Sequence, residues 1–256
     1  MKQRIFITGA SSGIGEALAV YYAGKGAVLG LAARRADALT ALSERLGGGH
    51  ACYPLDVTDA AALHDAAQDF IARFGAPEIV LASAGVSAGT LTEHAEDLAA
   101  FRRLMDINVY GMAATFAPFI PAMKAAGGFR RLVGLASVAG IRGLPGAEAY
   151  SASKAATIAY LESLRLEMRA CGIKVVTIAP GYIETPMTAV NPYRMPFLLP
   201  AEEAARRFAA AIETGNSYTV IPWQMGVLAK LLRVLPNAVY DRLFAGAPRK
   251  PRGLLK

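Results

Sequence analysis

Tyr150, Lys154 and Ser137 have the residue types and the spacing for proton transfer. Tyr150 and Lys154 lie four residues apart, and Ser137 lies thirteen residues before Tyr150. Four residues are a little over one helical turn, so the tyrosine and the lysine would project from one face. An ammonium favours the ionised form of a neighbouring phenol, whose unperturbed pKa is about 10. The pair is a candidate acid–base catalyst, and the Ser137 hydroxyl could hold a substrate oxygen.

A glycine-rich segment provides a place for a phosphate-containing cofactor. Residues 8–15 read Thr-Gly-Ala-Ser-Ser-Gly-Ile-Gly and lie between a predicted strand and a predicted helix. Small residues let the backbone approach a pyrophosphate, and a helix N-terminus offers free N–H groups and a partial positive charge. The spacing is not G-x-G-x-x-G, so its placement favours a dinucleotide site over a tight turn without a ligand. The expected contacts are Gly9, Ser11, Ser12, Gly13, Ile14 and Gly15.

The end of the second predicted strand distinguishes two cofactors. Arg34 and Arg35 stand where an acidic residue would bind the ribose hydroxyls of NAD. Guanidinium groups instead suit a 2′-phosphate, so NADP(H) is predicted and NAD(H) is less favoured. Asp37 is expected to begin the next helix rather than to bind ribose. The alternative is that both arginines are solvated surface residues.

Short apolar runs alternate with longer amphipathic segments. Strands are predicted at residues 4–8, 27–33, 51–55, 79–82, 131–136, 174–179 and 218–221. Helices are predicted at residues 14–25, 37–46, 59–74, 101–123, 150–171 and 201–214. Thr58 is expected to cap the third helix, and Pro118 and Pro121 to bend or end the fourth. This alternation favours an α/β fold, with a doubly wound parallel sheet in one domain of residues 1–256.

The composition excludes several function classes. The net charge is +7, but no basic stripe is interleaved with aromatic residues, so nucleic-acid binding is not expected. The three histidines have no metal-ligand spacing, and no metal is predicted. Cys52 and Cys171 are expected to be reduced thiols. The early first strand leaves no room for a signal peptide, and no apolar run is long enough to span a bilayer. A cytoplasmic protein is therefore predicted.

Taken in order, the motifs resemble those of the short-chain dehydrogenase/reductase family. The similarity covers roughly residues 3–222 and rests on Thr8-Gly-x3-Gly13-x-Gly15, Asp56-Val57, Asn108, Ser137, Tyr150-x3-Lys154 and Pro180-Gly181. It implies a single Rossmann-like domain with a seven-stranded parallel sheet, often assembled as a homodimer or homotetramer. Each residue taken alone could be an ordinary structural residue. Their shared order and spacing make that reading unattractive.

The resemblance also implies residue roles. Asn108, Ser137, Tyr150 and Lys154 would be catalytic. Tyr150 and Lys154 would also contact the cofactor, Lys154 at its ribose, and Asn108 would support a water chain. The further cofactor contacts implied are Asp56, Val57, Ala84, Gly85, Pro180, Gly181, Ile183 and Thr185. Ile183 would meet the nicotinamide amide through its backbone. The chain departs from the family after the fourth strand, where Ala-Ser-Ala-Gly replaces Asn-Asn-Ala-Gly and removes side-chain support.

A pKa near 7 for Tyr150 would require a large environmental effect. A change of about three pKa units corresponds to about 4 kcal/mol. We expect Lys154, together with the positive nicotinamide ring of the oxidised cofactor, to supply it.

Two apolar segments follow the sixth predicted strand. Residues 187–200 form a proline-punctuated apolar segment that would cover a mostly apolar substrate, although the same side chains could pack on the core or on a neighbour. Residues 223–244 are expected to form two helices broken at Pro236, within an amphipathic C-terminal extension of residues 223–256. This extension could be a dimer contact, a wall of the substrate site or, less favoured, a peripheral membrane contact.

The sequence thus predicts an NADP(H)-dependent oxidoreductase. It would transfer a hydride between the nicotinamide and a carbonyl or secondary alcohol of a small, mostly apolar substrate, with Tyr150 as the acid–base catalyst. The alternative is a non-catalytic NADP-binding sensor or scaffold, which would not need the four catalytic residues. A sugar-nucleotide epimerase also fits Tyr-x3-Lys, but the short region after the sixth strand leaves little space for a nucleotide-sugar domain.

Overall fold

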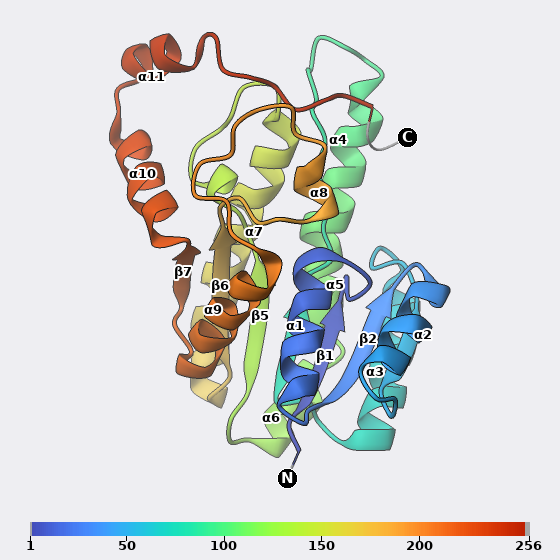
Figure 1. Cartoon of the computed structure of the whole chain (residues 1–256). Coiled ribbons are helices and arrows are strands. Elements are labelled where there is room, and N and C mark those ends of the chain that lie inside the picture. Colours follow the sequence, from blue (N-terminus) through green and yellow to red (C-terminus); the bar gives the residue numbers. More distant parts are fainter. Residues whose placement is uncertain (1, 254–256) are drawn as a thin grey trace.

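A seven-stranded parallel sheet forms the centre of the molecule (Figure 1). The computed structural model describes residues 2–253. The strand order is β3-β2-β1-β4-β5-β6-β7, and every neighbouring pair is parallel. The strands are β1 (Arg4–Thr8), β2 (Val28–Ala33), β3 (Ala51–Pro54), β4 (Ile79–Ala82), β5 (Arg131–Leu135), β6 (Lys174–Pro180) and β7 (Tyr218–Ile221). All seven predicted strands are confirmed, each to within one residue at either end.

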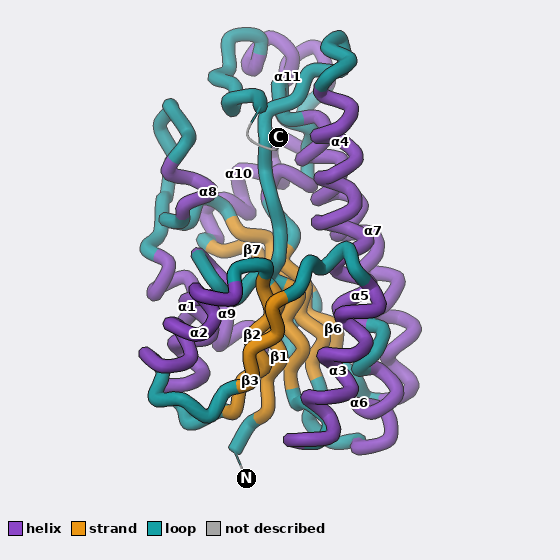
Figure 2. The backbone as a smooth tube through the Cα atoms, turned by 90° about the vertical axis from the view of Figure 1, so that its right-hand side faces the viewer, coloured by secondary structure: helices purple, strands orange, loops and turns teal. Residues whose placement is uncertain are grey.

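Helices cover both faces of this sheet, as Figure 2 shows. One layer contains α1 (Gly13–Gly24), α2 (Ala36–Arg45) and α9 (Ala201–Thr214), and the other contains α3 (Ala60–Phe74), α5 (Gly111–Phe116), α6 (Ile120–Ala126) and α7 (Glu148–Met168). Successive strand residues face opposite layers, so Ile5 and Ile7 join one core cluster while Phe6 joins the other. The strands are therefore apolar on both faces, and this is the doubly wound fold that the alternation predicted.

The order in which the chain adds strands to the sheet reverses between β1 and β4. Strands β2 and β3 lie on one side of β1, and β4 to β7 lie on the other. In sheets of this kind a crevice opens beyond the carboxyl ends of the two strands at the reversal. Residues that follow β1 and β4 are consequently placed beside each other.

Two details of the predicted helices are wrong. The fourth helix begins earlier, as α4 (Asp97–Met105), and continues through a π-helical turn, Asp106–Tyr110, into α5. It ends at Phe116 before Pro118, and Pro121 lies in the first turn of α6, where its missing N–H costs nothing. Asp59 rather than Thr58 caps α3 and accepts from the Ala62 N–H at 3.0 Å. The Thr58 hydroxyl instead donates to Asp56 Oδ1 at 2.9 Å.

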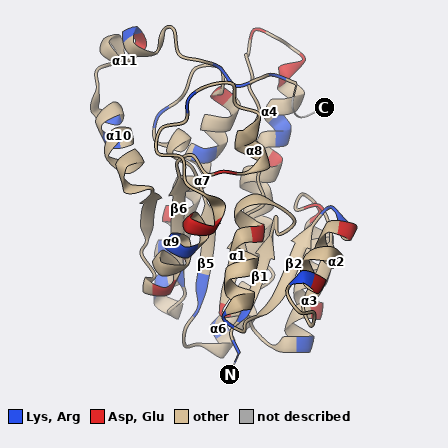
Figure 3. Cartoon of the chain, viewed as in Figure 1, with Lys and Arg blue, Asp and Glu red and all other residues tan. Residues whose placement is uncertain are grey.

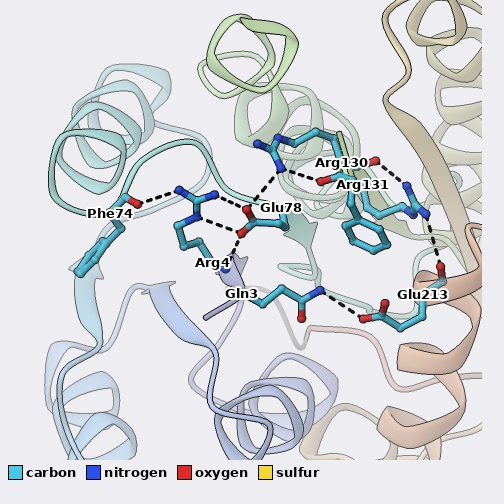
Figure 4. A network of polar contacts seen from close by, with 8 residues as sticks. Gln3, Arg4, Phe74, Glu78, Arg130, Arg131 and Glu213 are labelled. Atoms are coloured by element: carbon cyan, nitrogen blue, oxygen red, sulfur yellow. Dashed lines mark hydrogen bonds and ion pairs between the residues drawn. The ribbon is translucent and has the colours of Figure 1, made fainter. Parts of the chain in front are cut away.

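A polar network closes the amino edge of the sheet (Figure 4). Glu78, just before β4, accepts from the backbone N–H of Arg4 at 2.7 Å and pairs with the Arg4 guanidinium and with Arg130. Arg131 donates to the carbonyls of Ile212 and Glu213 at the end of α9, at 3.1 and 3.4 Å. We call Arg4, Glu78, Arg130 and Arg131 the amino-edge network. It joins β1, β4, β5 and α9.

The C-terminal extension lies at the carboxyl edge. It contains α10 (Trp223–Val234) and α11 (Asn237–Phe244), and the predicted break at Pro236 is confirmed. Residues 245–253, here called the tail, then return across this edge and carry several basic side chains (Figure 3). Among residues 2–253 no helix combines the length and the apolar character that crossing a membrane requires. Cys52 and Cys171 are both free thiols.

Candidate active site

The glycine turn after β1 is shaped for close approach. Gly9 has φ +68°, and a Cβ there would lie 2.7 Å from Ala84 Cα in the segment after β4. A Cβ at Gly15 would collide with the carbonyl oxygen of Gly9. The first turn of α1 therefore begins close against the backbone of two strand ends. Its N–H groups and the small side chains before it form a cradle that fits a pyrophosphate.

A cleft of about 430 Å³ opens next to this turn. Thirteen residues predicted to bind cofactor line it: Gly9, Ser11, Ser12, Gly13, Ile14, Gly15, Arg34, Arg35, Asp56, Val57, Ala84, Gly85 and Thr185. The sequence interpretation did not include the other seven, which are Ala33, Leu55, Ser83, Val86, Ile107, Pro186 and Met187. Most of these are apolar, and nothing in their residue types distinguishes them from core residues.

Arg34 and Arg35 are both exposed at the cleft, but their partners differ. Arg35 donates to the Ser11 carbonyl oxygen at 2.9 Å and so packs against the glycine turn. The Arg34 charge acts on Asp56. Burial works to raise the pKa of Asp56, but hydrogen bonds from Thr58 and the charges of Arg34 and Arg103 outweigh it, and the pKa lies below its ordinary value. The cleft therefore holds two guanidinium groups and one ionised carboxylate.

Ser137 and Tyr150 come together because the segment after β5 lies close to α7. Ser137 follows β5 and accepts from the Ala139 N–H at 3.2 Å. A Cβ at Gly140 would lie 2.6 Å from the backbone of Lys154, so only glycine allows this approach. The Ser137 hydroxyl lies close enough to Tyr150 to lower the pKa of its phenol, and the Tyr150 side chain keeps partial contact with solvent.

Lys154 is buried one turn after Tyr150. Its Nζ donates to the Leu135 carbonyl oxygen at 2.8 Å and lies 5.9 Å from the centroid of the Tyr150 ring. Burial lowers the pKa of Lys154 to about 8. Burial also raises the pKa of Tyr150, and the hydrogen bond with Ser137 only partly opposes it. Without cofactor the pKa of Tyr150 therefore lies above its ordinary value. The expected pKa near 7 includes the charge of the oxidised nicotinamide ring and stays a prediction.

Asn108 occupies the π-helical turn between α4 and α5. Its side-chain amide donates to the Val86 carbonyl at 3.0 Å, and its Oδ1 accepts from the Val86 N–H at 2.9 Å. Its amide also donates to Ser153 Oγ at 3.0 Å. Asn108 thus holds the segment after β4, where family asparagines are missing. Ser153 was not predicted, although its place immediately before Lys154 was a usable signal. A water chain through Asn108 stays a prediction.

Gly85 is the point at which these residues meet. A Cβ there would lie 3.2 Å from Asn108 Oδ1 and 3.8 Å from Lys154 Nζ. Gly85 also lines the cofactor cleft. The catalytic candidates and the cleft are therefore adjacent, although Asn108, Ser137, Tyr150 and Lys154 do not themselves line it.

Five predicted cofactor contacts lie outside the cleft lining: Tyr150, Lys154, Pro180, Gly181 and Ile183. Pro180 ends β6, and a Cβ at Gly181 would lie 2.7 Å from Met225 in α10. Ile183 is 2% exposed and pairs with Leu199 in an isolated bridge. Thr185 does reach the glycine turn, because its side chain would lie 3.2 Å from a Cβ at Gly13. The structure therefore brings Thr185 to the cleft, whereas Pro180, Gly181 and Ile183 do not line it.

Residues 187–200 carry exposed apolar side chains beside the site. The short helix α8 (Pro186–Ala189) begins the segment, and Met187, Val190 and Phe197 are 38%, 45% and 51% exposed. Burial raises the pKa of Tyr193 to about 12, and Tyr182 and Tyr150 lie close enough to add to the shift. This apolar segment therefore lies beside the catalytic candidates.

Comparisons with known proteins agree with this geometry. The sequence profile of the short-chain dehydrogenase family matches residues 3–194. An uncharacterised oxidoreductase of Myxococcus xanthus is 38% identical over 240 residues, covering 92% of this chain and 93% of that protein. A 2-dehydro-3-deoxy-L-rhamnonate dehydrogenase (NAD(+)) of a Sphingomonas species is 35% identical, covering 71% of this chain and 72% of that one.

A solved structure adds to this agreement. A Burkholderia cenocepacia short-chain dehydrogenase in complex with NADP superposes with a TM-score of 0.82 at 25% identity, covering 94% of this chain and 97% of that one. The profile match, the length of the similarity to relatives and the shared sheet agree, and the chain belongs to the short-chain dehydrogenase family of oxidoreductases.

Proposed function

We propose that this chain is an NADP(H)-dependent carbonyl reductase, reversible as an alcohol dehydrogenase, that acts on mostly apolar substrates. The observation that carries the proposal is the meeting of Ser137, Tyr150 and Lys154 beside a cleft that holds a glycine cradle and two arginines. The bound nicotinamide would supply or accept the hydride. The chain itself would bind the cofactor, orient the substrate oxygen and move one proton.

The direction of the proton transfer follows from burial. Because burial raises the pKa of Tyr150, its phenol is protonated at neutral pH and can donate to a carbonyl oxygen. Ser137 would hold that oxygen. Lys154 is still mostly protonated at pH 7, since its pKa is about 8, and it would stabilise the phenolate that remains. At neutral pH these protonation states suit the proton donation that carbonyl reduction requires.

The preference for NADP(H) rests on Arg34. Arg35 already contacts the glycine turn, whereas Arg34 is exposed at the cleft beside Asp56. A 2′-phosphate near Arg34 would gain a charge-assisted contact worth about 1.5–3 kcal/mol. Relatives are named with either cofactor, so the arginine pair is the basis of the choice. Arg34→Ala should weaken NADPH binding at least about tenfold and leave NADH binding nearly unchanged, as fluorescence titration would show.

Tyr150→Phe tests the reaction. It should reduce kcat for NADPH-dependent reduction of apolar ketones and aldehydes by about a thousandfold or more, while the Kd for NADPH stays within about threefold. Tyr160→Phe is the matched control, because Tyr160 lies on the same helix and is only partly buried. Activity that persists in Tyr150→Phe would exclude this mechanism. Wild-type protein that binds NADPH but reduces nothing would favour a sensor or scaffold.

A homodimer or homotetramer is also part of the proposal. It is supported by the exposed apolar residues of α10, of which Trp223, Val227, Leu231 and Val234 are 67%, 50%, 58% and 77% exposed. Large exposed apolar surfaces of this kind commonly mark interfaces. Light scattering with Leu231→Glu against wild type tests this: a mass that stays the same in both would remove α10 as the interface.

A further inference from the structure

The tail, residues 245–253, runs from α11 across the carboxyl edge toward α4 (Figure 1). The Gly89 N–H donates to the Pro251 carbonyl at 2.9 Å, and Gly89 forms a parallel bridge with Arg252. A second parallel bridge joins Thr90 to Ala147, which precedes Tyr150 by three residues. The tail, the segment after β4 and the segment before α7 therefore run side by side at the carboxyl edge.

Both loops are shaped to receive the tail. A Cβ at Gly89 would collide with the carbonyl oxygen of Lys250. Gly146 has φ +69°, and a Cβ there would lie 2.9 Å from the side chain of Arg249. Arg252 pairs with the buried Asp97 at 2.6 Å and with Glu96 at 3.0 Å. Backbone hydrogen bonds, two glycines that leave room for the tail, and an ion pair with a buried carboxylate together give the tail a defined place in the fold.

Lys250 is the half-buried basic residue of this tail that has no anionic partner in residues 2–253; Arg249 forms no ion pair there either, but it is exposed. Its Nζ donates to the Met187 carbonyl oxygen at 3.2 Å, and Met187 lines the cofactor cleft. Arg252 has two carboxylates, whereas within residues 2–253 Lys250 forms no ion pair. An ammonium has three donors, and a half-buried one normally meets an anion. Burial lowers the pKa of Lys250 to about 8, as expected for a cation that lacks such a partner.

We propose that Lys250 binds an anionic oxygen of a ligand in the active site, so that the tail forms part of the binding site. The inference rests on the proposed function. The anion is either the cofactor pyrophosphate or a carboxylate on the substrate. In the second case, the apolar segment at residues 187–200 together with one cation defines the substrate class as an apolar carbonyl compound with one acidic group.

The experiment compares Lys250→Met and Lys250→Arg with wild type. Fluorescence titration gives the Kd for NADPH without substrate, and steady-state kinetics give KM for an apolar keto acid and for its methyl ester. Lys250→Met should raise either the Kd for NADPH or the KM for the keto acid about tenfold or more, with the ester affected less than about twofold. Lys250→Arg should restore most of the loss.

The controls separate binding from structure. Lys124→Met removes an exposed lysine of α6 at the opposite edge of the sheet and should change neither constant. Thermal unfolding is measured first, and Lys250→Gln replaces Lys250→Met if the latter is unstable. A higher Kd identifies the cofactor as the source of the anion, and a higher KM for the keto acid alone identifies the substrate.

Two results would overturn the inference. One is that both constants in Lys250→Met equal those of wild type. The other is that acid and ester lose affinity equally, which would show that Lys250 only supports the fold. Either result, with an active wild type, leaves the proposed function intact. If the wild type is inactive but its Kd for NADPH still rises in Lys250→Met, the inference about Lys250 stands and the proposed function is excluded.

Discussion

Arginines make the main polar contacts at both edges of the sheet, but their partners differ. At the amino edge, Arg4 and Arg130 surround Glu78, and each group sits on or beside a strand (Figure 4). At the carboxyl edge, Arg142 donates to the carbonyls of Leu232 and Leu235 at 2.7 and 2.9 Å. There the partner is the covering extension rather than the sheet.

The arginines of the amino edge stabilise the fold, whereas those of the carboxyl edge hold the segments that cover the site. The amino-edge network joins three strands and a helix that must be in place for the core to exist, so loss of a partner exposes an unpaired charge there. Arg142 and Arg252 attach the extension and the tail, which cover the site without being part of the sheet. We expect mutations at the amino edge to affect unfolding and mutations at the carboxyl edge to affect binding.

Glu78→Gln should have the largest effect on stability. It removes the only carboxylate that the described structure places beside Arg4 and Arg130, and it should lower the free energy of unfolding by about 2–3 kcal/mol. Urea unfolding measures the loss. KM and kcat of the folded fraction should stay within about twofold, because the network lies at the edge opposite the cleft. Glu44→Gln, an exposed glutamate of α2, is the control.

The same variant should change the response to acid. Burial favours a higher pKa for Glu78, but hydrogen bonds and charge from Arg4 and Arg130 prevail and hold the pKa below its ordinary value. A depressed carboxyl pKa contributes stability above the unfolded-state pKa of about 4.3, and that contribution is lost as pH falls through the lower folded-state pKa. Wild type should therefore lose more stability below about pH 4 than Glu78→Gln does. Parallel acid profiles would contradict the assignment.

Arg142→Ala should have an intermediate effect that appears first in binding. It removes the donors to the end of α10, the bond to Asn237 at 3.0 Å and the stacking on Tyr240 at 4.0 Å. The extension should become more accessible to limited proteolysis, and KM should rise about three- to tenfold because Arg142 also lies five residues after Ser137. Arg233→Ala, an exposed arginine of α10, is the matched control. If Arg142→Ala lowered the free energy of unfolding as much as Glu78→Gln does, the carboxyl edge would govern stability as well, and the expected difference between the two edges would be wrong.

Arg252→Gln should have the smallest effect. Glu96 is exposed, Arg252 is itself partly exposed, and the buried Asp97 keeps the hydrogen bond from the Leu91 N–H at 2.8 Å, so thermal unfolding should change little. Looser docking of the tail should raise the constant that depends on Lys250 about two- to threefold. The Kd for NADPH and the KM values are measured as for Lys250→Met. Arg249→Gln, which changes an exposed arginine of the same tail, is the control. If Arg252→Gln raised the Kd or the KM more than Lys250→Met does, the Arg252 ion pairs rather than the Lys250 ammonium would determine binding.

Local patterns determined the architecture and the place of the chemistry. Strand positions followed from short apolar runs, since both faces of a parallel sheet are buried. The glycine turn could be recognised because small residues stand between a predicted strand and a predicted helix, where Gly9 and Gly13 adopt positive φ values that favour glycine. Tyr150 and Lys154 share a face because of helical spacing alone. These features depend on neighbours in the sequence, and the sequence therefore contains them.

Only the tertiary structure decided how those groups are charged and covered. The pKa values of Tyr150 and Lys154 depend on how completely the surrounding segments exclude water, and no spacing reports that. Asn108 holds Val86 and Ser153, which no local pattern connects. Lys250 reaches Met187 across 63 residues of chain. Such contacts follow from how packed elements meet in space, and desolvation then sets their chemistry.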